Sequence, residues 1–440
     1  MVEYEEPGQN PDRRRQRFNR LSGTHARSGR SPSPARHRLR RRRLQRRERL
    51  MTSLLLIVWL IVGGVHIGAP LIYFGLMRRV GAKRDYNIEQ KPIEPDVSVI
   101  IPTYNEAPVI AKKIANLLEN NYPLDKLEVI ITDGGSKDGT VEIARELLER
   151  RSVRARILTQ RERRGKSYGV NVALSAAKNE IICLSDAECM WEKGALHNAL
   201  KYISDPSIGS VTGIHALSGS AEGLSLSIEG SYRSIYRMLR VAESKLHSTP
   251  VAEAEIQVFR YSDVKKVDPR VGADDTCIAL CVVEKGLRAI AAEDVMFFDP
   301  TPGSWTGRFR QKFRRGQHIL QAFLKHSRLI FRRRDIFSSV IFPMEFFIYV
   351  INPLLFPLFL VLTVTLMATN LLLALLIAGA LAVVAAVPGL RTAFTTYLTN
   401  NLTMLAAIIQ EARGNKQLVW TKIDETRVSP ETAEPPVIPS

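Results

Sequence analysis

The chain has 440 residues, a formal net charge of +18 and 45% hydrophobic residues. This length allows two ordinary domains, but charge and apolar residues are spread unevenly, so the averages describe no single part of the chain. The four cysteines form no C-x-x-C pair, which favours small apolar residues in a reducing compartment over zinc ligands or disulfides. They are Cys183, Cys189, Cys277 and Cys281.

The first 50 residues carry most of the positive charge, with 16 Arg and no Lys against 5 acidic residues. Arg, Ser, Pro and Gly dominate and apolar periodicity is lacking, which predicts a disordered tail over 1–50. The run Arg36–Arg49 fits either a nucleic-acid-binding arm or a polybasic flank at an anionic membrane surface. The apolar segment that follows favours the membrane, so we expect no nucleic-acid partner.

An uncharged segment, Leu54–Met77, is about as long as the ~20 residues that a membrane-spanning helix requires. It is too long for a signal peptide, and no small-residue cleavage site follows it. We therefore predict a transmembrane helix over 52–77, with a kink because Gly63, Gly64, Gly68 and Pro70 interrupt it.

A second membrane region is predicted over 336–410, where apolar stretches are broken by Pro353 and Pro357. Two spans are expected, roughly 353–367 and 371–386, preceded by an interfacial helix. The stretch 393–409 is less apolar, and it either spans the membrane or lies flat on it. The proline-rich segment 415–440 is predicted to be a disordered tail.

Between these regions, short β-branched runs alternate with amphipathic helical patterns. This alternation predicts right-handed crossovers and a parallel α/β sheet covered on both faces. In such sheets, ligands bind at the carboxyl ends of the strands. The expected strands are Val97–Tyr104, Leu127–Asp133, Arg154–Gln160 and Glu180–Asp186, and the expected helices lie within 106–121 and 140–151.

Polar residues gather where these strands end. The first strand runs into Tyr104, Asn105 and Glu106, the second ends at Asp133 in "DGGSKDGT", and the fourth ends in "SDAE". A lone "DGGS" is usually only a turn, and a D-x-E triplet is usually a surface strand end, but consecutive strand ends meet at one sheet edge. No dinucleotide-binding or P-loop motif is present.

In order and spacing, six motifs resemble the membrane-embedded family 2 glycosyltransferases, which have a GT-A (Rossmann-like) fold. They are "VSVIIPTYNEAPVI", "VIITDGGSKDGT", "RRGKSYGVNVAL", "SDAE", "GADDTCIAL" and "RQKFRRGQ". The family includes hyaluronan, chitin and cellulose synthases and enzymes that add one sugar. The resemblance implies a GT-A domain over about 96–330, and the tail "WTKIDETR" is also typical of relatives.

The resemblance also implies roles for individual residues. Thr103, Glu106 and Asp133 would line a nucleoside pocket, Lys166 would approach the diphosphate, and Asp186 would contact nucleotide and metal. Glu188 would be the second metal ligand, and Asp275 the general base. Gln311, Arg314 and Arg315 would lie on the acceptor and diphosphate side.

The expected reaction explains these residue types. Charge builds on the nucleoside diphosphate as it leaves, and Mg²⁺ or Mn²⁺ held by carboxylates would neutralise it. A carboxylate on the far side of the sugar would take the proton of the acceptor hydroxyl, and in-line attack would invert the anomeric carbon. Asp274 and Asp275 could instead only cap the helix that follows them.

Three departures from the family pattern stand out. Gly134 replaces a second acid after Asp133, and Glu188 replaces an Asp, so metal geometry differs or a water bridges. Arg315 stands where processive synthases have a Trp that stacks on the acceptor sugar. Its charge puts channel-forming polymer synthesis in doubt. Arg314 and Arg315 suit diphosphate binding, although a basic helix on the membrane surface explains them equally.

We therefore expect an inverting, metal-dependent glycosyltransferase that moves a sugar, most simply from a UDP-sugar, to a lipid-linked or saccharide acceptor. The alternatives are a processive polysaccharide synthase and a non-catalytic membrane-anchored polyanion-binding protein. We place the chain in the cell membrane, multi-pass, with its catalytic domain cytoplasmic and in contact with membrane lipids.

This topology conflicts with the positive-inside rule, because the Arg-rich tail would lie outside. Either translation starts at Met51, or Leu54–Met77 forms a hairpin or interfacial helix with both ends inside.

Overall fold

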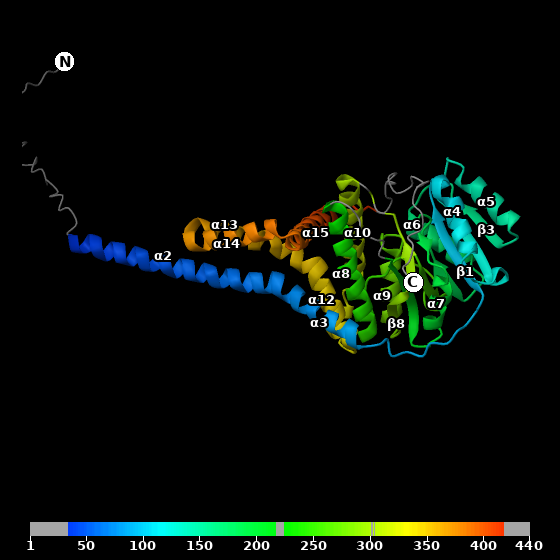
Figure 1. The fold of residues 1–440 in the computed structure, drawn as a ribbon, viewed down its shortest axis with the longest axis horizontal. Coiled ribbons are helices and arrows are strands. Elements are labelled where there is room, and N and C mark those ends of the chain that lie inside the picture. The colour runs from blue at the N-terminus through cyan, green and yellow to red at the C-terminus, as the bar shows by residue number, and fades with distance from the viewer. Residues whose placement is uncertain (1–33, 217–223, 301, 303, 418–440) are drawn as a thin grey trace, which may run out of the picture. The chain divides into compact units, whose positions relative to one another are not determined.

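The computed structural model describes residues 34–216, 224–300, 302 and 304–417. Within these residues, the middle of the chain forms an eight-stranded mixed sheet in the order β3-β2-β1-β4-β7-β6-β8-β5 (Figure 1). The strands are β1 Val97–Thr103, β2 Leu127–Asp133, β3 Arg154–Thr159, β4 Ile181–Leu184, β5 Met190–Trp191, β6 Ile208–His215, β7 Gln257–Arg260 and β8 Arg288–Phe298.

The four strands predicted from the sequence form the parallel half of this sheet, as expected. Their register brings the strand ends level, because Thr103 lies opposite Asp133 and Asp133 lies opposite Thr159. The polar residues that follow β1 and β2 therefore start from the same edge of the sheet.

The other half of the sheet is not parallel throughout. β7 pairs antiparallel with both β4 and β6, β8 runs parallel to β6, and β5 pairs antiparallel with the end of β8. The parallel pairing predicted for the first four strands is confirmed, and the strands beyond β4, which the sequence did not reveal, make the sheet mixed. β7 also has a helix before and after it in the sequence, so strand–helix alternation alone does not reveal that this strand runs antiparallel.

Helices cover both faces of the sheet. Val97, Val99 and Ile101 of β1 belong to one core, while Ile100 between them belongs to the other. The first core contains residues of α4 (Ala107–Leu118), α5 (Thr140–Arg150) and α7 (Ala195–Ile203). The second contains residues of α6 (Lys166–Ala176), α9 (Asp274–Glu284) and α10 (Trp305–Lys325). The helices α4 and α5 are those predicted.

The N-terminal apolar segment is helical from α2 (Pro34–Gly63) through a π-helical turn η1 (Gly64–Gly68) into α3 (Ala69–Lys83). The predicted interruption thus falls on a π-helical turn. Residues 34–50 are helical, so the predicted disorder is wrong there, which fits the good helix propensity of Arg, Leu and Gln. Arg40–Lys83 counts as one continuous helix that is apolar enough to cross a membrane, which rules out the hairpin alternative.

The C-terminal membrane region also differs from its prediction. Residues Phe337–Thr369 form one helix long and apolar enough to cross a membrane, so the expected interfacial helix is continuous with the expected span. It contains η3 (Phe337–Ile341), α12 (Phe342–Phe346), η4 (Phe347–Ile351) and α13 (Asn352–Thr369).

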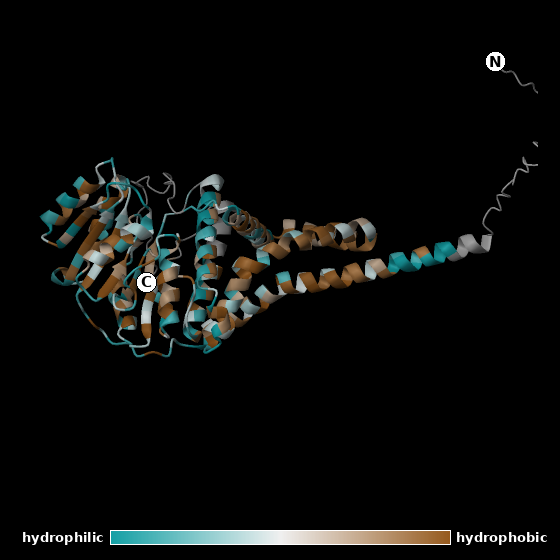
Figure 2. Ribbon diagram, turned by 180° about the vertical axis from the view of Figure 1, so that it is seen from behind, coloured by the Kyte–Doolittle hydropathy of each residue, from teal (hydrophilic) through white to brown (hydrophobic). Residues whose placement is uncertain are grey.

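Two further helices, α14 (Leu371–Ala386) and α15 (Pro388–Ala412), bend by 109° and pass the same test only as a pair. Figure 2 shows the apolar colouring of α13 and α14. The tail motif "WTKIDETR" lies outside the described residues.

Polar contacts join the apolar helices to one another. His66 in η1 hydrogen-bonds Asn352 of α13 through Nδ1 at 2.7 Å and the Tyr397 hydroxyl of α15 through Nε2. The indole nitrogen of Trp59 donates to Thr363 Oγ1 at 2.8 Å. A fourth contact reaches the sheet domain through α8 (Leu224–Leu246), where the Tyr73 hydroxyl of α3 donates to Glu243 Oε1 at 2.6 Å.

Candidate active site

The loop after β2 is organised by Asp133, which is fully buried. Its Oδ2 accepts hydrogen bonds from the backbone N–H groups of Gly135 and Ser136 at 2.9 and 2.8 Å, and its Oδ1 accepts from the Ser136 hydroxyl and, at 3.2 Å, from Thr103 Oγ1. Gly135 has φ +86°, a left-handed conformation that glycine adopts without strain. Both carboxylate oxygens of Asp133 therefore accept hydrogen bonds from the loop after β2, and one of them also accepts from the end of β1.

A pocket at the carboxyl end of β1, called here the β1 pocket, contains two of the three residues predicted to bind a nucleoside. Thr103 and Glu106 line it, but Asp133 does not. Asp133 is hydrogen-bonded to Thr103 and organises the adjoining loop, and its contact with the nucleoside stays a prediction. The guanidinium of Arg163 stacks 3.8 Å over the Tyr104 ring, and both residues also line this pocket.

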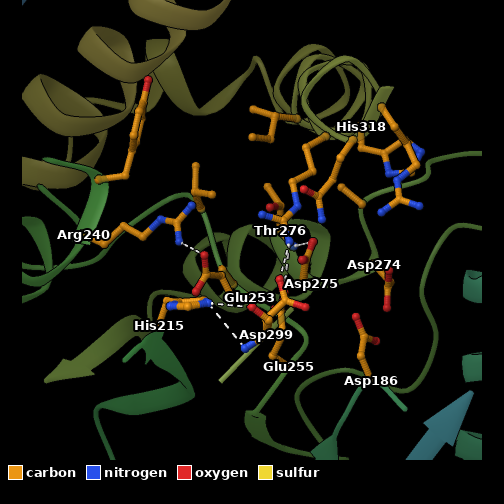
Figure 3. Close-up of a pocket in the computed structure, with 18 of the residues that line it drawn as sticks. Asp186, His215, Arg240, Glu253, Glu255, Asp274, Asp275, Thr276, Asp299 and His318 are labelled. Atoms are coloured by element: carbon orange, nitrogen blue, oxygen red, sulfur yellow. Dashed lines mark hydrogen bonds and ion pairs between the residues drawn. The ribbon is translucent and has the colours of Figure 1, made fainter. Parts of the chain in front are cut away.

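A second and larger pocket, called here the α10 pocket, lies between α8, α9 and α10 and is drawn in Figure 3. It contains Asp275, Gln311, Arg314 and Arg315, all predicted site residues. Three side chains line both pockets: Lys166, Asp186 and Glu188. The two pockets therefore meet at the residues predicted to hold diphosphate and metal.

At this junction Lys166 Nζ lies 2.6 Å from Asp186 Oδ1 and 3.5 Å from Asp274 Oδ2. Burial alone would lower the pKa of Lys166, but Asp186, Asp274 and Asp275 raise it above its usual value. Burial opposes ionisation of Asp186, yet Lys166, Arg314 and Arg315 bring its pKa below normal. Asp186 is thus held as a carboxylate and Lys166 as an ammonium.

Asp186 and Glu188 could hold a divalent cation. Both are partly exposed, and both supply hard carboxylate oxygens where the pockets meet. Nearby, Asp274 Oδ2 is buried and accepts no hydrogen bond, although Lys166 Nζ is 3.5 Å away. This oxygen-only donor set fits Mg²⁺ or Mn²⁺ rather than a thiophilic metal.

Asp274 and Asp275 lie in the first turn of α9, where acidic residues favour the helix dipole, but the N-cap residue is Ala273 and no side chain caps the helix. The Asp275 carboxylate accepts a hydrogen bond of 2.6 Å from the Thr276 N–H. Asp274 is buried, and burial raises its pKa to about 7 against the opposing effect of Lys166. Asp275 is more exposed, and burial with Asp186 and Glu253 raises its pKa, while Lys166 and the Thr276 N–H lower it.

Several pocket residues were missed by sequence reasoning. Glu253 and Glu255 precede β7, His215 ends β6, and Asp299 follows β8 (Figure 3). Burial and Glu253 raise the pKa of Glu255 well above normal, against the opposing effect of Arg315. The E-x-E pattern in "VAEAEIQVFR" was the available signal, but such a pair is common on protein surfaces.

Arg315 lies between two of these carboxylates. Its Nη2 is 3.3 Å from Glu255 Oε1 and 3.3 Å from Asp299 Oδ2. Gln311, one turn earlier on α10, is buried, and the Arg314 charge acts on Asp186. The face of α10 that carries Gln311, Arg314 and Arg315 therefore lines a pocket, which a basic helix lying on a membrane surface would not require.

Comparison with known proteins agrees with this geometry. Residues 98–267 match the family described as Glycosyl transferase family 2. Among solved structures, the mannosyltransferase PcManGT from Pyrobaculum calidifontis, in complex with GDP-Man and Mn²⁺, is 31% identical with a TM-score of 0.71. The similarity covers 82% of this chain and 100% of that one.

Two curated relatives match a shorter part. The probable glycosyltransferase YdaM of Bacillus subtilis is 26% identical over 58% of this chain, and the poly-beta-1,6-N-acetyl-D-glucosamine synthase of Staphylococcus aureus is 23% identical over 61%. In both cases the match spans 63% of the relative's own length. On the family match and the similarity along the full length of the solved mannosyltransferase, the chain belongs to glycosyl transferase family 2, is a glycosyltransferase and has the GT-A fold.

Proposed function

We propose that this glycosyltransferase is an inverting, metal-dependent enzyme that transfers a sugar from a nucleoside diphosphate sugar to a lipid-linked or saccharide acceptor. The observation that carries the proposal is the junction of two pockets at Lys166, Asp186 and Glu188. A donor needs room for its nucleoside on one side of the diphosphate and for its sugar and the acceptor on the other.

The β1 pocket suits the nucleoside. The stacked pair of Tyr104 and Arg163 offers a flat surface for a base, and Glu106 offers a carboxylate to base or ribose N–H and O–H groups. Gly169 lets α6 pack closely against β2 at this pocket, because a Cβ there would approach Gln160 Nε2 to 3.0 Å and Thr132 Oγ1 to 3.1 Å. Asp133 acts indirectly, by holding the loop that positions Thr103.

The junction suits the diphosphate. In this proposal Lys166 gives up part of its contact with Asp186 to bind phosphate oxygens, and the Arg314 guanidinium faces them from α10. Asp186 and Glu188 would hold Mg²⁺ or Mn²⁺, and such an ion would supply positive charge to the diphosphate.

Asp275 is the proposed general base. Its carboxylate lines the α10 pocket, is oriented by the Thr276 N–H and is more accessible than Asp274, whose nearest cation is Lys166. The raised pKa of Asp275 makes it a stronger proton acceptor than an exposed carboxylate. It takes the proton of the acceptor hydroxyl as that oxygen attacks the anomeric carbon, and the leaving diphosphate departs on the opposite face.

The donor is proposed to be a UDP-sugar, with GDP-mannose as a second candidate because the solved relative carries GDP-Man. The test is a panel of radiolabelled UDP- and GDP-sugars, supplied with Mn²⁺ and a membrane extract to the purified full-length chain. We expect one donor to be consumed and its sugar to appear in a lipid or saccharide fraction. Failure of every donor both to bind and to react would overturn the proposal.

Single addition is preferred over processive synthesis because Arg315 is tied to Glu255 and Asp299 rather than offering an aromatic surface for a growing chain. The synthase from Staphylococcus aureus keeps the polymerising alternative open for test. A ladder of long products in the same assay would favour the processive alternative.

The proposed location is the cell membrane, multi-pass, with the catalytic domain cytoplasmic, where nucleotide sugars are made. Two described helices are long and apolar enough to cross a membrane, or three if the bent pair α14 and α15 is one span. With the hairpin excluded, two resolutions of the charge conflict remain: translation from Met51, and an interfacial helix with both ends inside. Mass spectrometry of the natural N-terminus distinguishes them, because any peptide from before Met51 contradicts the first.

A further inference from the structure

The end of α9 away from Asp275 carries a second cluster of possible metal ligands, formed with the residue that caps α10. One ligand atom each of Cys281, Glu284 and His326 lies within 4.8 Å of those of the other two. Cys277 precedes Cys281 by one helical turn, so both thiols are on one face of α9. The His326 side chain interacts with both thiols and with Glu284.

The imidazole of His326 is held in the way that metal-binding histidines are held. Nδ1 lies 2.8 Å from Glu284 Oε1, while Nε2 is buried and makes no hydrogen bond. The whole residue is only 3% exposed. A buried ring nitrogen without a partner is destabilising, and histidine ligands usually bond a carboxylate through their other nitrogen.

We propose that Cys277, Cys281 and His326 bind a thiophilic divalent cation, zinc above all, and that Glu284 orients the imidazole. Two thiolates and one imidazole nitrogen are typical zinc ligands, whereas the carboxylates near Asp186 suit Mg²⁺ or Mn²⁺. Binding releases the two thiol protons to solvent. The partial exposure of Cys281 and Glu284 gives the ion a route of entry.

The charges around the cluster allow a cation. Lys325 and Arg332 are nearby, but Lys325 Nζ is paired with Asp268 at 3.2 Å and Arg332 Nη1 donates to the Glu284 carbonyl at 2.6 Å. Two thiolates balance a divalent ion, and the carbonyl end of α9 adds negative potential. A bound ion would hold the end of α9 close to the end of α10. The same two helices carry Asp275 and Arg315.

The first experiment measures zinc bound to the purified full-length chain by mass spectrometry of the metal, after dialysis against zinc-free buffer. We expect stoichiometric zinc in the natural sequence and in Cys183→Ala, a matched control whose buried thiol lies in β4. Cys281→Ala and His326→Asn should each lose the metal, and Glu284→Gln should weaken its retention by about 10-fold to 100-fold.

A second measurement needs no variant, so it remains decisive if substitutions prevent folding. Cobalt bound to the natural chain should give thiolate-to-metal charge-transfer absorption, which carboxylate ligands cannot give. Absence of that absorption together with absence of stoichiometric zinc would overturn the proposal. Zinc retained in full by both Cys281→Ala and His326→Asn would overturn it as well. Neither readout depends on sugar transfer.

Discussion

Lys166 Nζ lies 2.6 Å from Asp186 Oδ1, at the point where the two pockets of the active site meet. The lysine comes from the start of α6 and the aspartate from the loop after β4, so the contact joins two segments at the edge of the sheet. Because the ammonium neutralises Asp186 and faces Asp274, its removal leaves adjacent carboxylates unbalanced.

Lys166→Gln should weaken binding of nucleoside diphosphate. A hydrogen bond to a charged group contributes about 1.5–3 kcal/mol, which corresponds to a roughly tenfold to hundredfold increase in Kd. Isothermal titration in the presence of Mn²⁺ measures this, with Lys112→Gln on the exposed face of α4 as the matched control. Equal affinity in the two variants would show that Lys166 does not face the diphosphate.

Glu188→Gln tests the second metal ligand. If Glu188 touches the ion directly, the Mn²⁺ concentration for half-maximal transfer should rise about tenfold or more, while Asp186→Asn should abolish transfer. A metal titration of the initial rate distinguishes the two variants. An unchanged Mn²⁺ requirement in Glu188→Gln would leave Asp186 as the only ligand of the pair.

Asp133→Asn tests whether this residue shapes the loop or contacts the nucleoside. Asn offers one acceptor oxygen in place of two, so the bonds to Gly135, Ser136 and Thr103 cannot all persist. We expect the free energy of unfolding to fall by about 1–3 kcal/mol, together with nucleotide affinity. Lost affinity with an unchanged melting temperature would instead indicate direct contact.

Many residues around the β1 pocket, where the sugar donor is proposed to bind, could be predicted from the sequence. The β-branched runs are continuous, and their carboxyl ends are level in a parallel sheet, so Thr103, Asp133 and Asp186 had to start near one edge. The pattern could not tell which carboxylate would face a ligand. Nor could it show that the glycine turn would present two N–H groups and a hydroxyl to the Asp133 carboxylate.

Several residues of the α10 pocket could not be predicted from the sequence. Glu255, His215 and Asp299 come together only through the antiparallel pairing around β7 and the parallel pairing of β6 with β8. These contacts join segments tens of residues apart and leave no periodic signal. The helix at 34–50 was also missed, because its charge suggested disorder although its residues favour helix.

Arg315→Trp should not convert the enzyme into a polymerising one. The Trp restores the aromatic residue of processive relatives but removes the partner of Glu255 and Asp299, which lie in the same pocket. We expect lower activity and products extended by a single sugar, resolved by gel or mass spectrometry. Arg310→Trp, an exposed position on the same helix, is the control. Long products from Arg315→Trp would contradict this reasoning.

Asp275→Asn shows whether Asp275 deprotonates the acceptor in a metal-dependent sugar transfer. We expect the rate of transfer to fall by about 10²–10⁴-fold while nucleoside diphosphate still binds in the presence of Mn²⁺. Asp96→Asn, which changes an exposed carboxylate outside both pockets, should keep full activity. Transfer by Asp275→Asn at the rate of the unmodified chain would show that Asp275 is not the general base.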